Sequence, residues 1–326
     1  MRSHPIYTAA LRALALLMTL APAAASAIDG VSEINQTCAV LTGCFTGDTA
    51  GFPVTITTQG SYRLTSNLVV PDEDTTGILY SVSNVAIDLN HFGIIRSDCQ
   101  SNASCPAFFG AGSGIRTSSA TNTRTTVQNG DITGMGSGGL VLGSNAQVMR
   151  MRITRSGGTG ITAQSDALID QNTVSVSFGN GIAVTFRSTV SNNRVSSSGL
   201  GGISATNNGL ISGNVVQTSG SHGISADDGA SISNNTVTSS QQSGIEVGAA
   251  STVFHNISRN NALHGISAGT ASNVFGNTVY INSGYGLNLS SNTAYRDNMI
   301  SSNFQGSVMN GINLLGNACG GNTSCP

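Results

Sequence analysis

The segment "SHGISADDGASISNNTVTSSQQSGIEV", from Ser221 to Val247, holds a His, two adjacent Asp and a Glu close together in the chain. Carboxylates and histidines at such spacing can serve as acids and bases on a carbohydrate, but they also decorate the surfaces of repeating scaffolds. The candidate catalytic residues, in chain order, are His222, Asp227, Asp228, Glu246 and His264. Within the segment, "GIS" begins at Gly223 and "GIE" at Gly244. This spacing of 21 residues indicates a repeat that positions the candidate residues.

A glycine recurs at a constant interval of 21 through seven consecutive steps. An aliphatic residue follows each glycine, and another apolar residue follows two positions later, as in Ile224 and Ala226. This period of two predicts a β-strand in every unit. The glycines are Gly139, Gly160, Gly181, Gly202, Gly223, Gly244, Gly265 and Gly286.

A second column consists entirely of asparagine: Asn172, Asn193, Asn214, Asn235, Asn256, Asn277 and Asn298. We expect these residues at sharp turns, because Asn tolerates left-handed backbone angles better than other non-glycine residues. Stacked amides can also hydrogen-bond from one coil to the next, as asparagine ladders do in cross-β assemblies. Three short strands per unit, with Gly or Asn at the corners, predict a solenoid. A leucine-rich repeat is disfavoured, because the return segments are poor helix formers.

The repeated "G-I-x-[AV]" and "[IV]-x-x-N-x-V" units resemble the β-helix repeats of the pectin-lyase-like superfamily. In addition, "FPVTITTQGSYRLTSNLVV" followed by "NVAIDLNHFGI" is similar to the opening coils of a group of secreted bacterial β-helix proteins. The resemblance covers Phe52 to the C-terminus and implies an all-β fold, a right-handed parallel β-helix. It leaves the activity open, since the superfamily includes lyases, glycosidases, epimerases and non-catalytic adhesins.

The expected organisation is one domain of about eleven coils. We predict a signal peptide at residues 1–27, an N-terminal cap at 28–51, the β-helix at 52–300, and the last coil with a C-terminal cap at 301–326. Caps are expected because a stack of coils leaves an open strand edge at each end. An extra loop at 96–113 and a four-residue insertion near 118–124 interrupt the period.

The N-terminal segment 1–27 is typical of a cleavable signal peptide, with two arginines, a short apolar run and a final Ala25-Ser26-Ala27. The apolar run is too short to span a bilayer, and no other segment approaches that length. We therefore expect a secreted or periplasmic bacterial protein without a membrane span. Cleavage removes two positive charges and no acids, so the net charge changes from −2 to −4, which disfavours nucleic acid as a partner.

The six cysteines form three units with the spacing C-x5-C, which favours local disulfides and agrees with export. The expected pairs are Cys38 with Cys44, Cys99 with Cys105, and Cys319 with Cys325. Zinc is disfavoured because it usually takes closer C-x2-C pairs. We expect no cofactor and no metal; Ca²⁺ at Asp227 and Asp228 is conceivable, but it needs more oxygen ligands than these two residues supply.

The residues between the two inward positions of each glycine strand point outward, which gathers the candidates on one face. Glu246 is the expected acid or base, because it is the only carboxylate at an outward position of this strand. The expected substrate-binding residues around it are Ser225, Ser267, Tyr285 and Asn288. Two features count against catalysis. Lyases and epimerases that act on uronates usually need cationic groups, but this face offers no Lys, and the arginine nearest to the Glu246 coil is Arg187. In addition, "ADDG" is equally typical of a turn.

Two hypotheses about function follow. The favoured one is an exported β-helix protein that binds an extracellular polysaccharide or a surface partner without a catalytic set; the oligomeric state stays open. The alternative is a polysaccharide-processing enzyme of the lyase, glycosidase or epimerase type that acts around Glu246. A basic set, Arg150, Arg152 and Arg194 with Asp170, is interpreted as a solvated surface with weak ion pairs.

Overall fold

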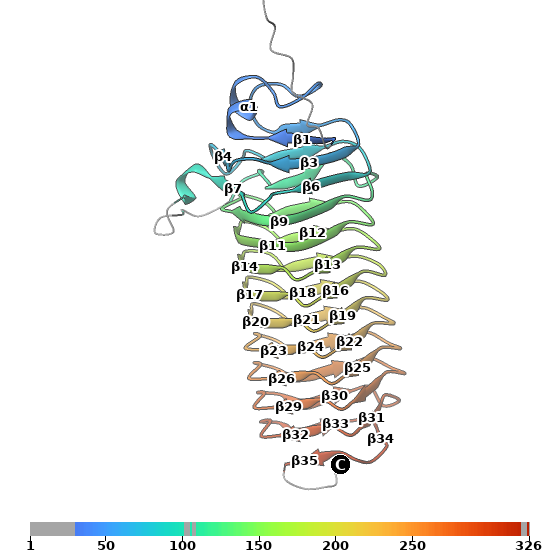
Figure 1. The fold of residues 1–326 in the computed structure, drawn as a ribbon. Helices are drawn as coiled ribbons and strands as arrows, with labels where there is room; N and C mark the ends of the chain where they lie inside the picture. Colours follow the sequence, from blue (N-terminus) through green and yellow to red (C-terminus); the bar gives the residue numbers. More distant parts are fainter. Residues whose placement is uncertain (1–29, 101–104, 106–108, 321–324, 326) are drawn as a thin grey trace, which may run out of the picture.

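The structure, a computed structural model, describes residues 30–100, 105, 109–320 and 325. The predicted signal peptide lies outside the described residues. Figure 1 shows a tall stack of coils, in which equivalent strands of successive coils lie one above the other. These strands pair in parallel, with partners separated by one repeat through the regular region, as in Ile203 with Ile224. The predicted fold class, an all-β right-handed parallel β-helix, is confirmed.

One strand per coil builds a twelve-stranded sheet that carries the glycine repeat. The sheet has twelve strands, one per coil, against the roughly eleven coils expected. The additional coil is the first one, which begins before the periodic region. The strands are β2 (Val54–Ile56), β5 (Ile78–Tyr80), β8 (Ile115–Thr117), β10 (Leu140–Leu142), β12 (Ile161–Ala163), β15 (Ile182–Val184), β18 (Ile203–Ala205), β21 (Ile224–Ala226), β24 (Ile245–Val247), β27 (Ile266–Ala268), β30 (Tyr285–Leu289) and β33 (Gly306–Met309).

The other strands form a 23-stranded sheet that bends at the asparagine column. On one side of the bend lie β1 (Val31–Ile34), β3 (Gly60–Leu64), β6 (Val85–Asp88), β13 (Leu168–Asp170), β16 (Thr189–Ser191), β19 (Leu210–Ser212), β22 (Ser231–Ser233), β25 (Thr252–Phe254), β28 (Asn273–Phe275), β31 (Ala294–Arg296) and β34 (Ile312–Asn313). On the other lie β4 (Leu68–Val70), β7 (Gly93–Arg96), β14 (Thr173–Ser177), β17 (Arg194–Ser198), β20 (Val215–Ser219), β23 (Thr236–Thr238), β26 (Ile257–Arg259), β29 (Thr278–Tyr280), β32 (Met299–Ser301) and β35 (Ala318–Cys319). The long strands β9 (Thr126–Thr133) and β11 (Gln147–Ser156) continue through the bend.

The asparagine column forms the predicted ladder inside the coil. Asn235 is 1% exposed; its Nδ2 donates to Asn256 Oδ1 at 3.0 Å and to the Ile211 carbonyl at 2.9 Å. The same bonds recur from Asn172 to Asn298. Each amide therefore satisfies the next along the stack, as buried polar groups require.

The reason given above for asparagine is wrong in one respect. The left-handed backbone angle belongs to the residue before each ladder asparagine, such as Asn234 with φ 56° or His255 with φ 55°. These preceding residues vary in type and point outward, whereas the ladder asparagines are buried. The column is asparagine because of its hydrogen bonds, and its neighbour makes the turn.

The glycine column is explained by space. Around Gly223, a Cβ atom would meet the Val237 side chain, Ser240 Oγ at 2.7 Å and the Gly244 carbonyl oxygen at 2.7 Å. The regular glycines of this column have no left-handed φ. The twelve-stranded sheet thus approaches the opposite wall closely at these positions, and only a residue without a side chain fits.

All three predicted disulfides form: Cys38–Cys44 near the first coil, Cys99–Cys105 in the extra loop after β7, and Cys319–Cys325 near the last coil. The helix α1 (Gln36–Leu41) lies over the first coil, and the 3-10 helix η1 (Ser97–Cys99) belongs to the extra loop. Strand β1, which lies within the predicted cap at 28–51, already pairs in parallel with β3. Within the described residues, no helix is both long and apolar enough to cross a membrane.

Candidate functional site

The outer face of the twelve-stranded sheet carries the predicted residues around Glu246. Ser225, Glu246, Ser267 and Asn288 are register partners from β21 to β30, so their Cα atoms lie about 4.8 Å apart from coil to coil. Asn288 Nδ2 donates to Ser267 Oγ at 3.3 Å, and Ser267 Oγ donates to Glu246 Oε1 at 3.1 Å. We name Glu246, Ser267 and Asn288 the Glu246 row; it forms one hydrogen-bonded chain over three coils.

His264 and Tyr285 lie beside this row. Their rings stack with centroids 6.0 Å apart and an interplanar angle of 26°. His264 Nδ1 accepts the backbone N–H of Tyr285 at 3.0 Å, so the neutral ring carries its proton on Nε2. Burial lowers the pKa of His264, and the Glu246 carboxylate opposes this only in part. His264 is therefore a neutral hydrogen-bond donor next to a carboxylate.

His222 lies two coils away from His264, at about 10 Å by strand spacing. Its Nδ1 is buried and, within the described part of the chain, lacks a hydrogen-bond partner. Ser243, in the coil between the two histidines, is fully buried, and its hydroxyl also lacks a partner in that part. The two histidines consequently flank a buried serine in their column.

Asp227 and Asp228 are exposed and follow the end of β21. The Asp228 carboxylate accepts the Ala249 backbone N–H at 2.7 Å, which is the way an aspartate supports the turn of the next coil. The described residues contain no group of three or more His, Cys, Asp or Glu that could hold a metal ion. The structure thus joins Glu246 with His264, Ser267, Tyr285 and Asn288, and leaves the two aspartates in a turn.

Chemically, this arrangement presents hydrogen-bonding groups rather than a paired acid and base. An ionised carboxylate has about four lone-pair sites, and the Ser267 hydroxyl occupies one of them on Glu246. The Asn288 carbonyl and the Nε2–H of His264 add an acceptor and a donor. Such a row can bind several hydroxyl groups of a sugar chain that lies along the coils.

The sequence interpretation missed Arg116, an arginine on this same face. It occupies the outward position of β8 and is the register partner of Leu79 and Val141. The two insertions hid it, because the regular count starts only at Gly139. Arg116 lines a cavity of about 470 Å³ together with Phe52, Pro53, Asp74, Thr75, Thr76, Leu79, Thr117 and Ser118.

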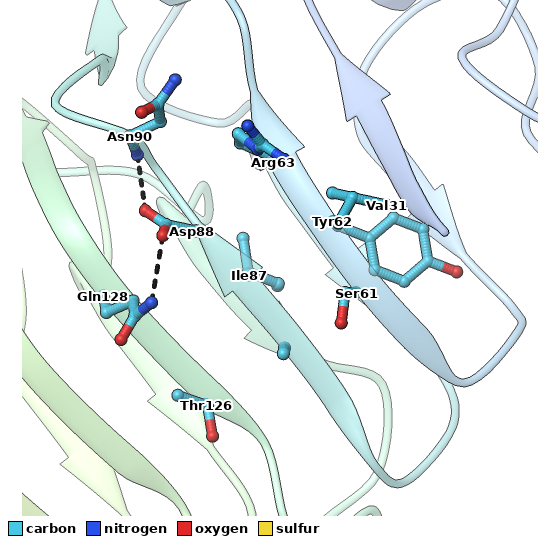
Figure 2. Close-up of a pocket in the computed structure, with 10 residues that line it drawn as sticks. Val31, Ser61, Tyr62, Arg63, Ile87, Asp88, Asn90, Thr126 and Gln128 are labelled. Carbon is cyan, nitrogen blue, oxygen red and sulfur yellow. Dashed lines mark hydrogen bonds between the residues drawn. The ribbon is translucent and has the colours of Figure 1, made fainter. Parts of the chain in front are cut away.

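A second cavity, of about 260 Å³, lies on the 23-stranded sheet around Asp88. Figure 2 shows the residues that line it. The Asp88 carboxylate accepts the Asn90 backbone N–H at 2.8 Å and the Gln128 side-chain amide at 3.0 Å. The Asn129 side chain, which makes no part of this cavity's lining, also donates to both of its oxygens at 3.2 Å. Asp88 is therefore occupied by its own neighbours, and its hydrogen bonds hold the coils together here.

The basic set lies on the 23-stranded sheet. Arg152 pairs with Asp131 at 3.0 Å, with side chains 66% and 41% exposed, which makes the pair weak. Arg150 donates to Asn129 Oδ1 at 2.8 Å, while Asp170 accepts from Ser191 at 2.7 Å. These solvated contacts agree with the interpretation from the sequence.

Comparisons with known proteins agree with this fold. A family model described as "Periplasmic copper-binding protein (NosD)" matches residues 93–251. No curated protein sequence matches the chain. The described residues offer no cluster of three or more His, Cys, Asp or Glu for such a metal, and the chemistry of the Glu246 row is that of its own side chains.

Similar solved structures include the A-module of a mannuronan C-5 epimerase, AlgE4, from Azotobacter vinelandii, with 14% identity and a TM-score of 0.54, covering 87% of this chain and 88% of that one. A double mutant of the periplasmic alginate epimerase AlgG has 14% identity and a TM-score of 0.63, covering 87% and 84%. A GH87 α-1,3-glucanase catalytic domain in complex with tetrasaccharides has 11% identity and a TM-score of 0.55, covering 88% and 63%.

The chain is therefore a parallel β-helix protein, and its resemblance to the pectin-lyase-like superfamily is confirmed at the level of the fold. The matching family and one of these similar structures are described as periplasmic. That location agrees with the expected export, while cleavage of the signal peptide stays a prediction.

Proposed function

We propose that this protein is an exported β-helix protein that binds an extracellular polysaccharide along the outer face of its twelve-stranded sheet. The observation that carries the proposal is the Glu246 row, in which Asn288, Ser267 and Glu246 are hydrogen-bonded over three coils. The row is pre-organised, so a ligand has little side-chain freedom to remove on binding. The names of the similar structures, two epimerases and a glucanase, point to the same class of ligand.

His264 and Tyr285 extend this site sideways. The stacked ring pair offers a flat surface together with a Nε2–H donor, and Glu246 supplies an acceptor beside it. Recognition of a sugar by a few fixed polar groups next to a ring is a common arrangement in ligand sites. We therefore assign ligand contact to Glu246, His264 and Tyr285, and support of the row to Ser267 and Asn288.

Binding of a polysaccharide panel to the purified mature protein tests the proposal, for example by affinity electrophoresis followed by calorimetry. Glu246→Gln removes the charged acceptor and should weaken binding of the retained glycan about tenfold, which corresponds to one charge-assisted hydrogen bond. Glu33→Gln makes the same chemical change at an exposed position of β1 and should leave binding unchanged. Equal effects of the two substitutions would contradict the assignment.

The alternative function is a polysaccharide-processing enzyme acting around Glu246. It is favoured by the position of a partly buried histidine beside a carboxylate: burial lowers the pKa of His264 and the Glu246 charge opposes this in part, and perturbed groups of this kind are typical of active sites. The same panel should then show new reducing ends or unsaturated uronates, with and without Ca²⁺, that disappear in Glu246→Gln. Binding without any turnover would leave the non-catalytic function.

A further inference from the structure

We infer that the cavity at Arg116 is a second ligand site, which binds a sugar residue carrying an anionic group, either a carboxylate or a sulfate ester. It lies on the same face as the Glu246 row but six coils away, about 29 Å by strand spacing. The inference goes beyond the proposed function, because the two sites share no residue and can be tested separately.

The first observation is the state of Arg116. Within the described residues, its guanidinium makes no hydrogen bond and no ion pair. Its stem lies half-buried between Leu79 and Val141, its register partners on the adjacent coils. Aliphatic neighbours of this kind hold the stem of an arginine while its charged end remains available. A guanidinium fork without a partner matches a carboxylate or sulfate with two parallel hydrogen bonds.

The second observation is what surrounds the guanidinium. The cavity of about 470 Å³ is also lined by the aromatic residue Phe52, the acidic residue Asp74 and the hydroxyl-bearing residues Thr75 and Ser118. This volume lies within the range of small-molecule sites, which combine an apolar wall with a few polar groups. Asp74 and Arg116 form no ion pair, so the cavity keeps an acceptor and a cationic donor apart. A sugar acid offers hydroxyls for Asp74 as well as an anion for Arg116, whereas a small inorganic anion offers Asp74 no hydrogen-bond donor.

The third observation is the rigidity of the cavity wall. Asp74 Oδ1 accepts the Ala111 backbone N–H at 2.8 Å, and the Gly112 N–H donates to the Glu73 carbonyl at 2.9 Å. Thr75 Oγ1 donates to Asp72 Oδ1 at 2.7 Å. The loop after β4 is thereby held by the extra loop before β8. A Cβ atom on Gly112 would meet backbone atoms of Thr75, so the two loops are packed without space between them, and the site is formed before a ligand arrives.

Calorimetry on the full mature protein tests this site with three probes of equal length: an oligomer of a uronic acid, a sulfated neutral oligosaccharide and the unmodified neutral oligosaccharide. We expect at least one anionic probe to bind ten times more tightly than the neutral one, and its affinity to fall as NaCl is raised. Arg116→Gln should abolish that preference. The anionic probe that binds the unmodified protein more tightly than the neutral probe identifies the anionic group.

Arg194→Gln is the matched control, because it removes the same charge from the 23-stranded sheet, where Arg194 hydrogen-bonds Gln217. It should change the affinity less than twofold. Equal binding of the neutral and anionic probes, equal losses in Arg116→Gln and Arg194→Gln, or no binding of any probe would each overturn the inference. Glu246→Gln keeps the Arg116 site intact, so failure of the proposed function leaves the anion preference measurable. A circular-dichroism melt of each variant verifies that the fold is retained.

Discussion

Replacing Asn235 by leucine tests the ladder most directly. The Asn235 amide donates to the Ile211 carbonyl and to Asn256 Oδ1, and its oxygen accepts the backbone N–H and the side-chain Nδ2 of Asn214. Asn214 Nδ2 has other acceptors at 2.9 and 3.1 Å, but its backbone N–H is left buried without a partner. A buried donor left without a partner lowers the free energy of unfolding by about 1–3 kcal/mol, and the loss of each of the other hydrogen bonds lowers it by about 0.5–1.5 kcal/mol.

We therefore expect Asn235→Leu to lower the free energy of unfolding by about 3–5 kcal/mol, more than the roughly 1–3 kcal/mol suggested by a single lost partner. Asn234 provides the matched control, since it is exposed and has φ 56°. Asn234→Leu should cost only about 1–2 kcal/mol of backbone strain, and Asn234→Gly close to nothing. Urea titrations followed by circular dichroism measure all three, with the m-value compared because stacked coils can unfold in parts. A larger loss in Asn234→Leu than in Asn235→Leu would refute the reasoning.

Two further predictions concern packing and pH. Gly223→Ala should cost about 1–3 kcal/mol by overpacking, because its Cβ would meet Val237 and the Gly244 carbonyl, whereas Gly209→Ala, whose nearest neighbour lies at 3.0 Å, should cost less in the same urea titration. For His264, burial lowers the pKa below its ordinary 6.5, so the unfolded chain takes up the proton first, and stability present above pH 6.5 is lost as the pH falls toward the folded pKa. His264→Asn should remove this part of the pH dependence in melts between pH 5 and 8, because asparagine does not titrate. The substitution keeps the hydrogen bond to the next coil, as Asn180 in the same column accepts the Gly201 N–H at 2.8 Å. An unchanged pH dependence would contradict the assignment.

The repeat made the fold predictable because each coil contacts mainly its two neighbours. Residues one repeat apart are therefore direct partners, as Asn193 and Asn214 are in the ladder, and a column in the sequence becomes a stack in space. The disulfides were predictable for a similar reason, since each closes a short local loop such as Cys38–Cys44. In both cases the interacting residues lie close together in the sequence or one repeat apart, so their contact could be predicted from their spacing.

The backbone angle of the turn was harder to place, because two asparagines are adjacent at Asn192-Asn193 and at Asn234-Asn235. Composition distinguishes them once the whole column is considered. The column that makes the turn also contains Gly213 and Gly276, both with positive φ, whereas the ladder column never varies. The first column accepts Gly, Gln and His, so it requires only the left-handed backbone angle of the turn. The ladder column is always Asn, so it requires the hydrogen bonds of the side-chain amide.

The binding surfaces follow a different logic from the fold. A strict repeat presents the same side chains in every coil, so a ligand gains specificity only where a coil departs from the pattern. Glu246 is such a departure, because its direct neighbours in the column are Ser225 and Ser267, and its position on the outer face could be counted from the period. Arg116 could not be counted, because part of its cavity wall comes from the loop at 74–76, which is held by a second loop at 110–112, and both loops lie before the regular repeat begins. These loops meet only through contacts such as Ala111 with Asp74, 37 residues apart, and such contacts are visible only in the folded chain.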